Sequence, residues 1–335
     1  MKRIIILSGI SAALLILIIG GSIIAIDKTK YNNDFVRVFP PHFTNIVSVQ
    51  KTKHGRFSIA GFANNKVYLH DRINQFLTIV GSNDTIHASV RIPKGFEIVI
   101  DSPYYSLFNG YIPEIRRGKI ANWSIDTVLN SLPGFTLMQP ISKSTSILRS
   151  IDLQQRKSIF LRSDLPKSPK DLLKKQVDGI LCTDGFLGYS KEHNGLVYVY
   201  RYRNQFLCMD TTLSVLLTGK TIDTTSVAKI AVSEFDGEIK MSKPPLVVNK
   251  EISVDGKYLF VHSNLITKNE SIDKAESNSV IDIYSILDGH YVCSFYVENS
   301  NGAKMKSFKV NRRILVAVFP GEIIRYDLNR QYLPF

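Results

Sequence analysis

Short apolar segments separated by Asn-Gly and Asp-Gly pairs recur along most of this chain and constrain its fold more than any other feature. A type I′ turn needs positive φ at both central residues, so these dipeptides favour tight β-hairpins. Residues 196–202, which follow one such pair, are rich in the β-branched and aromatic residues that strands prefer. The pairs of interest begin at Asn109, Asn194, Asn301, Asp184, Asp236, Asp255 and Asp288. The pattern predicts an all-β chain built from antiparallel hairpins.

A second pattern is an apolar strand that ends in aspartate at a turn, repeated about every 40–50 residues with insertions. The aspartates are Asp71, Asp126, Asp210, Asp288 and Asp327, with a weaker instance at Asp164. Roughly 23 candidate strands between residues 46 and 326, at four per repeat, predict a β-propeller of about six blades. The long interval from Asp210 to Asp288 indicates an excursion between blades, and seven blades stay an alternative. We expect the aspartates to cap turns rather than to act in metal binding or catalysis.

The end of the chain predicts how the propeller closes. Residues 250–297 contain one complete four-stranded meander, and residues 304–326 supply only three further strands. A fourth strand from residues 46–51 would complete this last blade and remove the exposed sheet edges. Helical signals are scarce. Ser168, Pro169 and Asp171 predict a short helix that ends near Val177, and residues 126–132 predict one helical turn.

The N-terminus carries an uncharged apolar stretch over residues 4–26. As a helix it spans roughly 34 Å, enough for the ~30 Å hydrocarbon core of a bilayer. Lys2 and Arg3 precede it, so the positive-inside rule predicts a cytoplasmic N-terminus and an extracytoplasmic remainder. We expect an anchor over residues 1–27, a stalk over 28–45 and a propeller over 46–335. A cleavable signal peptide is the alternative. Representative anchor residues are Ile4, Leu14, Leu15, Leu17 and Ile26.

The net charge of +13 suggests a basic surface, but the basic residues are dispersed and no long basic run is interleaved with aromatics. Together with an exported location, this argues against nucleic acid as a partner. A basic domain beside an anionic membrane would be drawn to it, but the favoured interpretation is a solvated basic surface. The three cysteines are Cys182, Cys208 and Cys293. Cys182 and Cys208 lie in neighbouring predicted strands and form the candidate disulfide. The alternative is that all three are small buried apolar residues.

No catalytic motif stands out in the sequence. It contains no nucleophile elbow, phosphate-binding loop or dinucleotide fingerprint. The histidines show no close pair typical of a metal site; they are His42, His54, His70, His87, His193, His262 and His290. Strands from different blades can still bring ligands together at a central channel, so enzymatic activity and any cofactor stay undecided. The sequence favours a non-enzymatic protein.

One aromatic and basic cluster is a candidate binding face. Aromatic residues and arginine are the types most enriched at interface hot spots. The cluster consists of Tyr104, Tyr105, Phe108, Tyr111, Arg116, Arg117 and Trp123. The alternative is that these side chains pack inside a blade.

The meanders at residues 194–210, 255–264, 279–297 and 314–329 resemble blades of TolB-like or NHL-like six-bladed β-propellers. Together with the N-terminal apolar segment, the chain resembles an uncharacterised membrane-anchored cell-envelope family of the Bacteroidota type. The resemblance implies a binding or scaffolding module that contacts an envelope protein in the periplasm. A propeller enzyme, either a metal-dependent hydrolase or lactonase or a redox subunit, is one alternative. A small-ligand sensor is the other.

Overall fold

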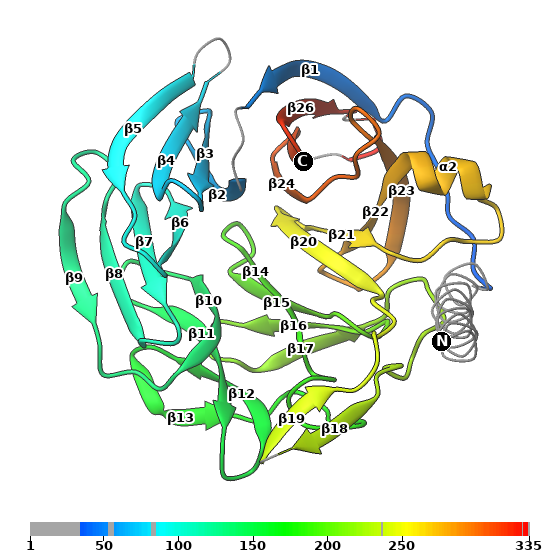
Figure 1. Ribbon diagram of the computed structural model, residues 1–335. Helices are drawn as coiled ribbons and strands as arrows, with labels where there is room; N and C mark the ends of the chain where they lie inside the picture. Colours follow the sequence, from blue (N-terminus) through cyan, green and yellow to red (C-terminus); the bar gives the residue numbers. More distant parts are fainter. Residues whose placement is uncertain (1–33, 53–56, 82–84, 236, 330, 334–335) are drawn as a thin grey trace, which may run out of the picture.

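The computed structural model describes residues 34–52, 57–81, 85–235, 237–329 and 331–333. These residues form six four-stranded antiparallel sheets, arranged as blades in a ring, and one additional two-stranded sheet (Figure 1). The predicted all-β propeller is confirmed, and within the described residues it has six blades rather than seven. The predicted anchor, residues 1–27, lies outside the described part of the chain. From residue 34 onward, no described helix has the length and hydropathy needed to cross a bilayer.

Each of the first three blades is a meander that runs from the channel outward. Blade 1 comprises β2 (Phe57–Ala63), β3 (Lys66–Asp71), β4 (Phe76–Val80) and β5 (Thr85–Arg91). Blade 2 comprises β6 (Glu97–Asp101), β7 (Tyr104–Asn109), β8 (Glu114–Lys119) and β9 (Ile125–Leu129). Blade 3 comprises β10 (Phe135–Pro140), β11 (Ser146–Asp152), β12 (Lys157–Arg162) and β13 (Leu165–Lys170).

The remaining blades follow the same plan except at the closure. Blade 4 comprises β14 (Gly185–Ser190), β15 (Gly195–Tyr200), β16 (Phe206–Asp210) and β17 (Val215–Gly219). Blade 5 comprises β20 (Asn249–Asp255), β21 (Tyr258–Ser263), β22 (Asn278–Ser285) and β23 (Tyr291–Glu298). Blade 6 comprises β24 (Ser307–Asn311), β25 (Ile314–Phe319), β26 (Glu322–Leu328) and, on its outer edge, β1 (Thr44–Lys51).

Strand β1 closes the ring by pairing antiparallel with β26, from Thr44 opposite Leu328 to Lys51 opposite Glu322. This confirms the predicted closure by residues 46–51, and the strand begins two positions earlier than expected. The pairing ties the two ends of the propeller together in one sheet. Neither edge of the last blade therefore opens the ring.

The apolar core lies between blades rather than inside one central cluster. Strand residues alternate between the two faces of a blade, so each sheet packs both of its faces against its neighbours. Leu69 of blade 1 packs with Val316 of blade 6, and Leu148 of blade 3 packs with Ile115 of blade 2. Large aromatic side chains such as Phe260 fill the contact between blades 5 and 6.

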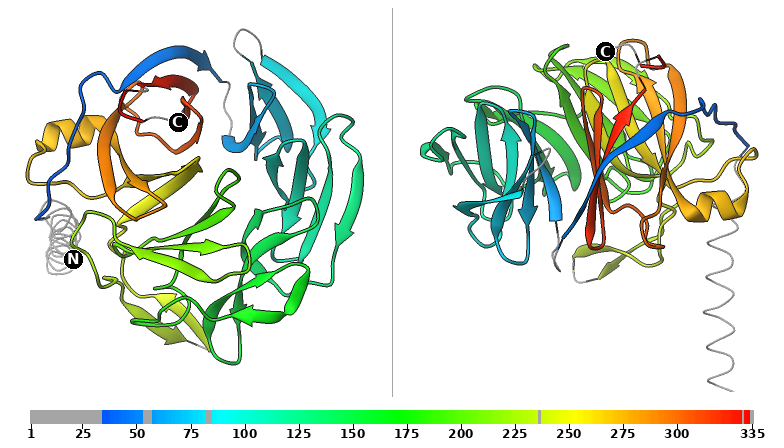
Figure 2. Two further views of the ribbon diagram at one scale, coloured as in Figure 1. Left: turned by 180° about the vertical axis from the view of Figure 1, so that it is seen from behind. Right: turned by 90° about the horizontal axis from the view of Figure 1, so that it is seen from above.

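The long interval predicted to hold an excursion contains two insertions. The connection from β17 to β20 carries the hairpin of β18 (Val232–Phe235) and β19 (Glu238–Met241). The turn between β21 and β22 is extended and contains helix α2 (Ile272–Ser277), whose N-cap is Ser271. Both insertions lie at the end of the propeller that carries the connections between blades and the turns between each second and third strand. We call this end the front face; it is turned toward the reader in Figure 1, and Figure 2 shows it from the side.

Both predicted helices are wrong. Residues 165–170 form β13, which pairs with β12 as the outer strand of blade 3, and residues 125–129 form β9. Pro169 lacks an N–H group, but an edge strand leaves such groups unpaired on its outer side, so proline is tolerated there. The local start signals of a helix were outweighed by pairing with a neighbouring strand.

Residues 34–43 belong to the segment predicted as a stalk, and they pack along blade 5. Phe35 is buried against Leu246, Val248 and Leu265, and Ser294 of β23 donates a backbone hydrogen bond to the Val38 carbonyl at 2.8 Å. Only residues 28–33 of the predicted stalk lie outside the described part of the chain. The globular unit therefore extends at least to Asp34.

Candidate functional site

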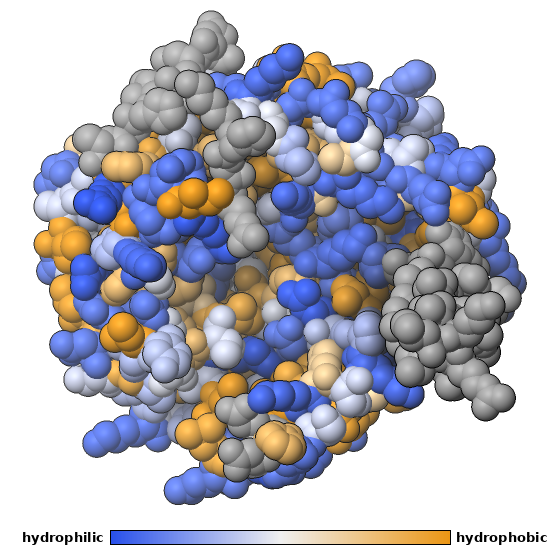
Figure 3. Space-filling model, in the orientation of Figure 1, coloured by the Kyte–Doolittle hydropathy of each residue, from blue (hydrophilic) through white to orange (hydrophobic). Residues whose placement is uncertain are grey.

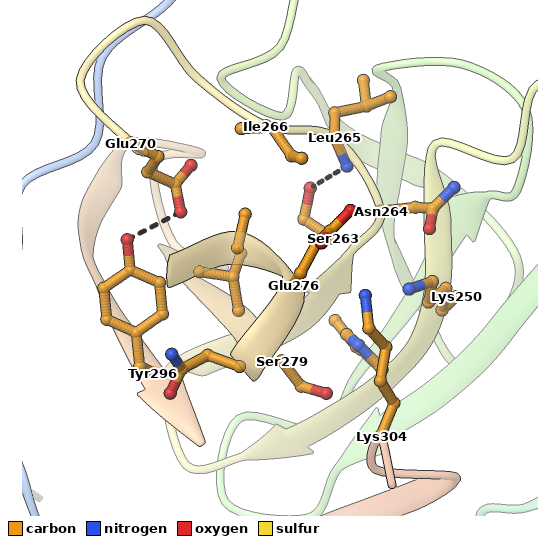
Figure 4. Close-up of a pocket in the computed structure, with 14 residues that line it drawn as sticks. Lys250, Ser263, Asn264, Leu265, Ile266, Glu270, Glu276, Ser279, Tyr296 and Lys304 are labelled. Atoms are coloured by element: carbon orange, nitrogen blue, oxygen red, sulfur yellow. Dashed lines mark hydrogen bonds between the residues drawn. The ribbon is translucent and has the colours of Figure 1, made fainter. Parts of the chain in front are cut away.

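A small pocket opens at the front end of blade 5, beside the connection to blade 6 (Figure 4). It has a volume of about 170 Å³. Its walls come from β20 to β23, from the extended turn that holds α2, and from the connection between β23 and β24. The lining residues are Lys250, His262, Ser263, Asn264, Leu265, Ile266, Glu270, Ala275, Glu276, Asn278, Ser279, Val280, Tyr296 and Lys304.

His262 lies at the inner wall of this pocket and is only 3% exposed. Burial lowers the pKa of its imidazole to about 3, and the positive charges of Lys250 and Lys304 act in the same direction. The ring is therefore neutral at neutral pH, with one nitrogen as a hydrogen-bond donor and the other as an acceptor. Phe308 of blade 6 packs edge-on against the imidazole, with 6.4 Å between ring centroids.

Ser279 contributes a hydroxyl group that has no hydrogen-bond partner, although the residue is only 3% exposed. Buried polar groups are nearly always paired, and leaving one unpaired costs about 1–3 kcal/mol. The residue follows Asn278 at the start of β22, so the sheet fixes its position in the pocket wall. An unpaired hydroxyl in a polar cavity is a ready partner for a bound molecule.

Two lysines and two glutamates supply the charges around the pocket. Lys250 is the second residue of β20, the inner strand of blade 5, and Lys304 lies in the connection to blade 6. Of the two lining carboxylates, Glu270 is already engaged: it accepts a hydrogen bond from Tyr296 at 2.8 Å and pairs with Arg37. Glu276 on α2 is the other carboxylate. Two lysines next to a neutral imidazole and a hydroxyl form the kind of donor set that binds carboxylate or phosphate oxygens.

Arg37 holds the outer wall of the pocket in place from the N-terminal segment. Its guanidinium is fully buried and forms two parallel hydrogen bonds with Asp282, Nε to Oδ1 at 2.7 Å and Nη2 to Oδ2 at 3.0 Å. Further donors reach the Leu265 carbonyl at 3.0 Å and the Ser263 hydroxyl at 2.8 Å. Burial alone would lower the pKa of Arg37, but Asp282 and Glu270 outweigh it and raise the pKa.

Several lining residues of the pocket thus contact the N-terminal segment directly. Ser263 and Glu270 bond to Arg37, while Tyr296 stacks on Phe39 with ring centroids 4.3 Å apart. The sequence could not indicate this contact, because more than 220 positions separate Arg37 from its partners. A shift of the pocket wall would therefore also displace Arg37 and Phe39, in the segment that leads toward the N-terminus.

A second cavity, of about 480 Å³, occupies the central channel toward the back face, the end opposite the front face. Apolar side chains such as Ile100 and Val254 line its middle. At the back end, Lys191 of the β14–β15 turn reaches across the channel to pair with Asp101 and to donate to the Ser102 carbonyl at 3.0 Å. Burial raises the pKa of nearby Asp255 to about 6, and Glu192 adds to the effect. Among the described buried polar groups without a partner, none lines this cavity, whereas the Ser279 hydroxyl lies in the blade 5 pocket.

The predicted binding face does not form one surface. Tyr105 is buried, and its hydroxyl donates to the Trp123 carbonyl at 2.8 Å while the two rings pack together. Tyr104 lies at the back end of β7, whereas Tyr111 lies in the turn at the front end and is 96% exposed. Tyr105 and Trp123 instead fit the alternative interpretation, in which these side chains pack inside a blade.

The two arginines of that face are also engaged within blade 2. Arg117 is buried and donates to Asp101 at 3.0 Å, and its guanidinium lies over the Tyr104 ring. Arg116 pairs with Glu114 at 2.6 Å and lies over the Phe96 ring. Tyr111 is the member of the set that offers a free side chain.

The remaining candidates have structural positions. Cys182, Cys208 and Cys293 are all free and buried, and Cys182 and Cys208 pack in different apolar clusters, so they do not form the candidate disulfide. Asp71, Asp210 and Asp288 accept backbone N–H groups of their turns, as expected. Asp126 and Asp327 instead contact Thr127 and Arg313. Among the described residues, no cluster of three or more His, Cys, Asp or Glu could hold a metal ion.

The comparisons with known proteins bear on the fold. No protein-family model and no curated protein matches the sequence. A crystal structure of a DUF4221 family member from Bacteroides vulgatus aligns with a TM-score of 0.52 at 12% identity, over 87% of this chain and 99% of that one. A virginiamycin B lyase from Staphylococcus aureus aligns with a TM-score of 0.49 at 11% identity, over 84% and 99% of the two chains. At 12% identity, the likeness to the DUF4221 structure shows the β-propeller fold alone.

Proposed function

We propose that this protein is a membrane-anchored, extracytoplasmic binding module whose blade 5 pocket takes a small anionic ligand. The observation that carries the proposal is the unpaired, buried hydroxyl of Ser279 in a cavity that also holds neutral His262 and the two lysines. A carboxylate or phosphate group would accept from the lysines and from the hydroxyl. The volume of about 170 Å³ admits a group of that size.

The pocket wall contacts residues 34–39, which lead toward the proposed membrane anchor. Ligand binding in the pocket would therefore affect the segment next to the anchor. Ligand oxygens near this wall would compete with the Ser263 hydroxyl and the Glu270 carboxylate for the N–H donors of Arg37 and change how firmly the N-terminal segment is held. This is the behaviour of a small-ligand sensor. The apolar segment 4–26, with Lys2 and Arg3 before it, supports the anchoring and the orientation proposed.

The test is ligand-dependent thermal stability of the full chain in a membrane-mimicking nanodisc. Inorganic phosphate, acetate and citrate serve as probes, with potassium chloride at matched ionic strength as the reference. A ligand that binds only the folded state raises Tm with its concentration. We expect at least one probe to do so, and we expect Lys304→Gln and Ser279→Ala to abolish the rise. Lys306→Gln, an exposed lysine two positions away that does not line the pocket, is the matched control and should retain it.

Equal Tm values in every probe and in chloride would overturn the ligand proposal. So would a rise that persists in Lys304→Gln and in Ser279→Ala, since the anion would then bind elsewhere. Membrane placement is tested separately, by retention of the full chain in membranes after an alkaline wash and by protease access from the outside only. Turnover of a probe by the purified chain would favour the enzyme alternative.

The sequence also predicts an envelope protein as a partner. Co-purification from cross-linked membranes, with the intact N-terminal segment present, tests that prediction. Recovery of no specific protein in repeated experiments would count against a scaffolding role and would leave ligand binding as the function.

A further inference from the structure

The front face carries exposed apolar side chains at the tips of successive blades. Such residues sit in the β3–β4, β7–β8 and β11–β12 turns, where Tyr111 is 96% exposed and Leu153 is 82% exposed. Ile73 and Ile112 lie in the same turns. Phe235 in the β18–β19 hairpin and Ile272 on α2 continue the series on blades 4 and 5. Figure 3 looks onto this face and shows apolar patches spread around its rim between polar residues.

The back face is less suited to an apolar contact. Its exposed apolar residues include Leu165, Leu216 and Leu287, all aliphatic. The aromatic side chains with the greatest exposure among the described residues, Tyr111 and Phe235, both belong to the front face. Tyrosine, whose ring carries a polar hydroxyl, is a type that favours the interface between hydrocarbon and water.

Basic side chains accompany the apolar tips. The connections between blades, which lie on the front face, carry exposed lysines at Lys94, Lys174, Lys175, Lys220, Lys243 and Lys306. Among the residues whose exposure the structure describes, exposed acidic side chains in the same connections are fewer, for example Asp171 and Glu234. Glu234 is also paired with Arg156 at 3.0 Å. A surface of apolar tips among lysines is complementary to a bilayer that contains anionic lipid.

The described chain begins at this same face. Asp34 pairs with Lys268 in the extended turn of blade 5 and Arg37 pairs with Asp282, so these contacts hold the segment against blade 5. Only residues 27–33 separate Asp34 from the apolar segment 4–26. A fully extended linker of that length reaches about 25 Å. If residues 4–26 cross the bilayer, the front rim of blade 5 is held within that distance of its surface.

We propose that the front face rests on the outer surface of the bilayer, with the tips of blades 1–3 and the β18–β19 hairpin entering the headgroup region. This inference rests on the anchoring proposed above, and it adds an orientation that anchoring alone does not specify. A propeller on a free stalk could present either end to the membrane. The apolar tips and the start of the described chain select the same end, and the lysines of the connections between blades lie there too.

Introduced cysteines test the orientation directly, because the three native cysteines are buried and should stay unlabelled. A fluorophore is placed at Tyr111→Cys and Leu153→Cys on the front face. The matched controls are Leu216→Cys and Leu287→Cys, two exposed apolar positions on the back face. Each full-length variant is reconstituted into vesicles of phosphatidylcholine and phosphatidylglycerol that contain a lipid with a nitroxide quencher on its acyl chain, and only vesicle-bound protein, collected by flotation, is measured.

We expect the front-face probes to lose most of their fluorescence and the back-face probes to lose little. Omitting phosphatidylglycerol should weaken the front-face quenching. Equal quenching at both faces, or none at the front face of floated protein, overturns the orientation while leaving the anchor intact. Protein that does not float would instead contradict the anchor. A third outcome is that the lipid in vesicles does not quench the front-face probes, while in native membranes these probes are shielded from aqueous iodide. The front face would then contact a protein partner and not the bilayer.

Discussion

Arg37 and Asp282 lie 245 positions apart in the sequence and form a buried ion pair through two parallel hydrogen bonds, at 2.7 and 3.0 Å. Removing one partner of a buried pair leaves the other charge without compensation, which typically costs 3–5 kcal/mol. We expect Arg37→Leu to lower the free energy of unfolding by about that amount. Arg72→Leu, which breaks an exposed pair with Glu97, should cost no more than about 1 kcal/mol. Urea unfolding of both variants measures the difference, and similar small losses would show that the Arg37 contact contributes little.

His262 predicts a specific pH dependence. Its folded pKa of about 3 lies well below the ordinary value of about 6.5, so between these values the unfolded chain binds more protons at this position. The free energy of unfolding therefore falls as pH decreases through this window, by at most about 1.4 kcal/mol per pH unit. His262→Gln removes this contribution and should make the protein less sensitive to acid than the wild type.

Buried carboxylates change the pH dependence of stability in the opposite direction. The wild type must therefore be compared with His262→Gln. Burial raises the pKa of Asp223 and of Asp255 to about 6, so the folded state holds more protons there and gains stability as pH falls toward 4. These contributions are common to the wild type and His262→Gln, so their difference isolates His262. Unfolding at several pH values gives that difference, which should be constant above pH ~7. Parallel curves down to pH ~4 would contradict the assignment.

We expect position 61, now a glycine, not to tolerate a side chain. Its φ is +145°, and a Cβ atom would lie 2.5 Å from the Ile100 carbonyl oxygen, where blade 1 approaches blade 2. We expect Gly61→Ala to destabilise the protein by about 3 kcal/mol or more, since backbone strain and steric overlap add. Gly302 has φ +73° with nothing within 4 Å, so Gly302→Ala should cost only about 1–2 kcal/mol. Thermal unfolding of the pair separates the effect of overlap from that of the backbone alone.

The burial of the cysteines predicts how fast their thiols react with a thiol reagent. All three are free and buried, and burial raises the pKa of Cys208 and of Cys293 to about 12. The native protein should therefore react slowly with a thiol reagent, and the protein unfolded in denaturant without reductant should titrate all three. A single reactive thiol after unfolding would mean that a disulfide had formed, contrary to the separation of Cys182 from Cys208.

Much of the architecture could be predicted because local sequence patterns determine it. Alternating apolar residues and tight-turn dipeptides such as Asn194-Gly195 act over a few positions, and their repetition predicted both the propeller and the number of blades. Closure by β1 was also predictable, because the last blade lacked one strand. The helix expected at Ser168 was lost because pairing with β12 outweighed its start signals. The charge pattern at the N-terminus predicts an anchor that stays to be tested.

The candidate site could not be found in this way. Lys250, His262, Ser279 and Lys304 come from three strands and a connection, and no spacing in the sequence distinguishes His262 from the other histidines. Whether a hydroxyl is left unpaired, or an imidazole is kept neutral by burial, depends on what surrounds it in three dimensions. Local sequence determined the strands, their turns and their repetition, since these rest on short-range backbone preferences. Tertiary packing alone decided the pocket, its link to Arg37 and the face on which apolar tips gather, since these arise where distant segments meet.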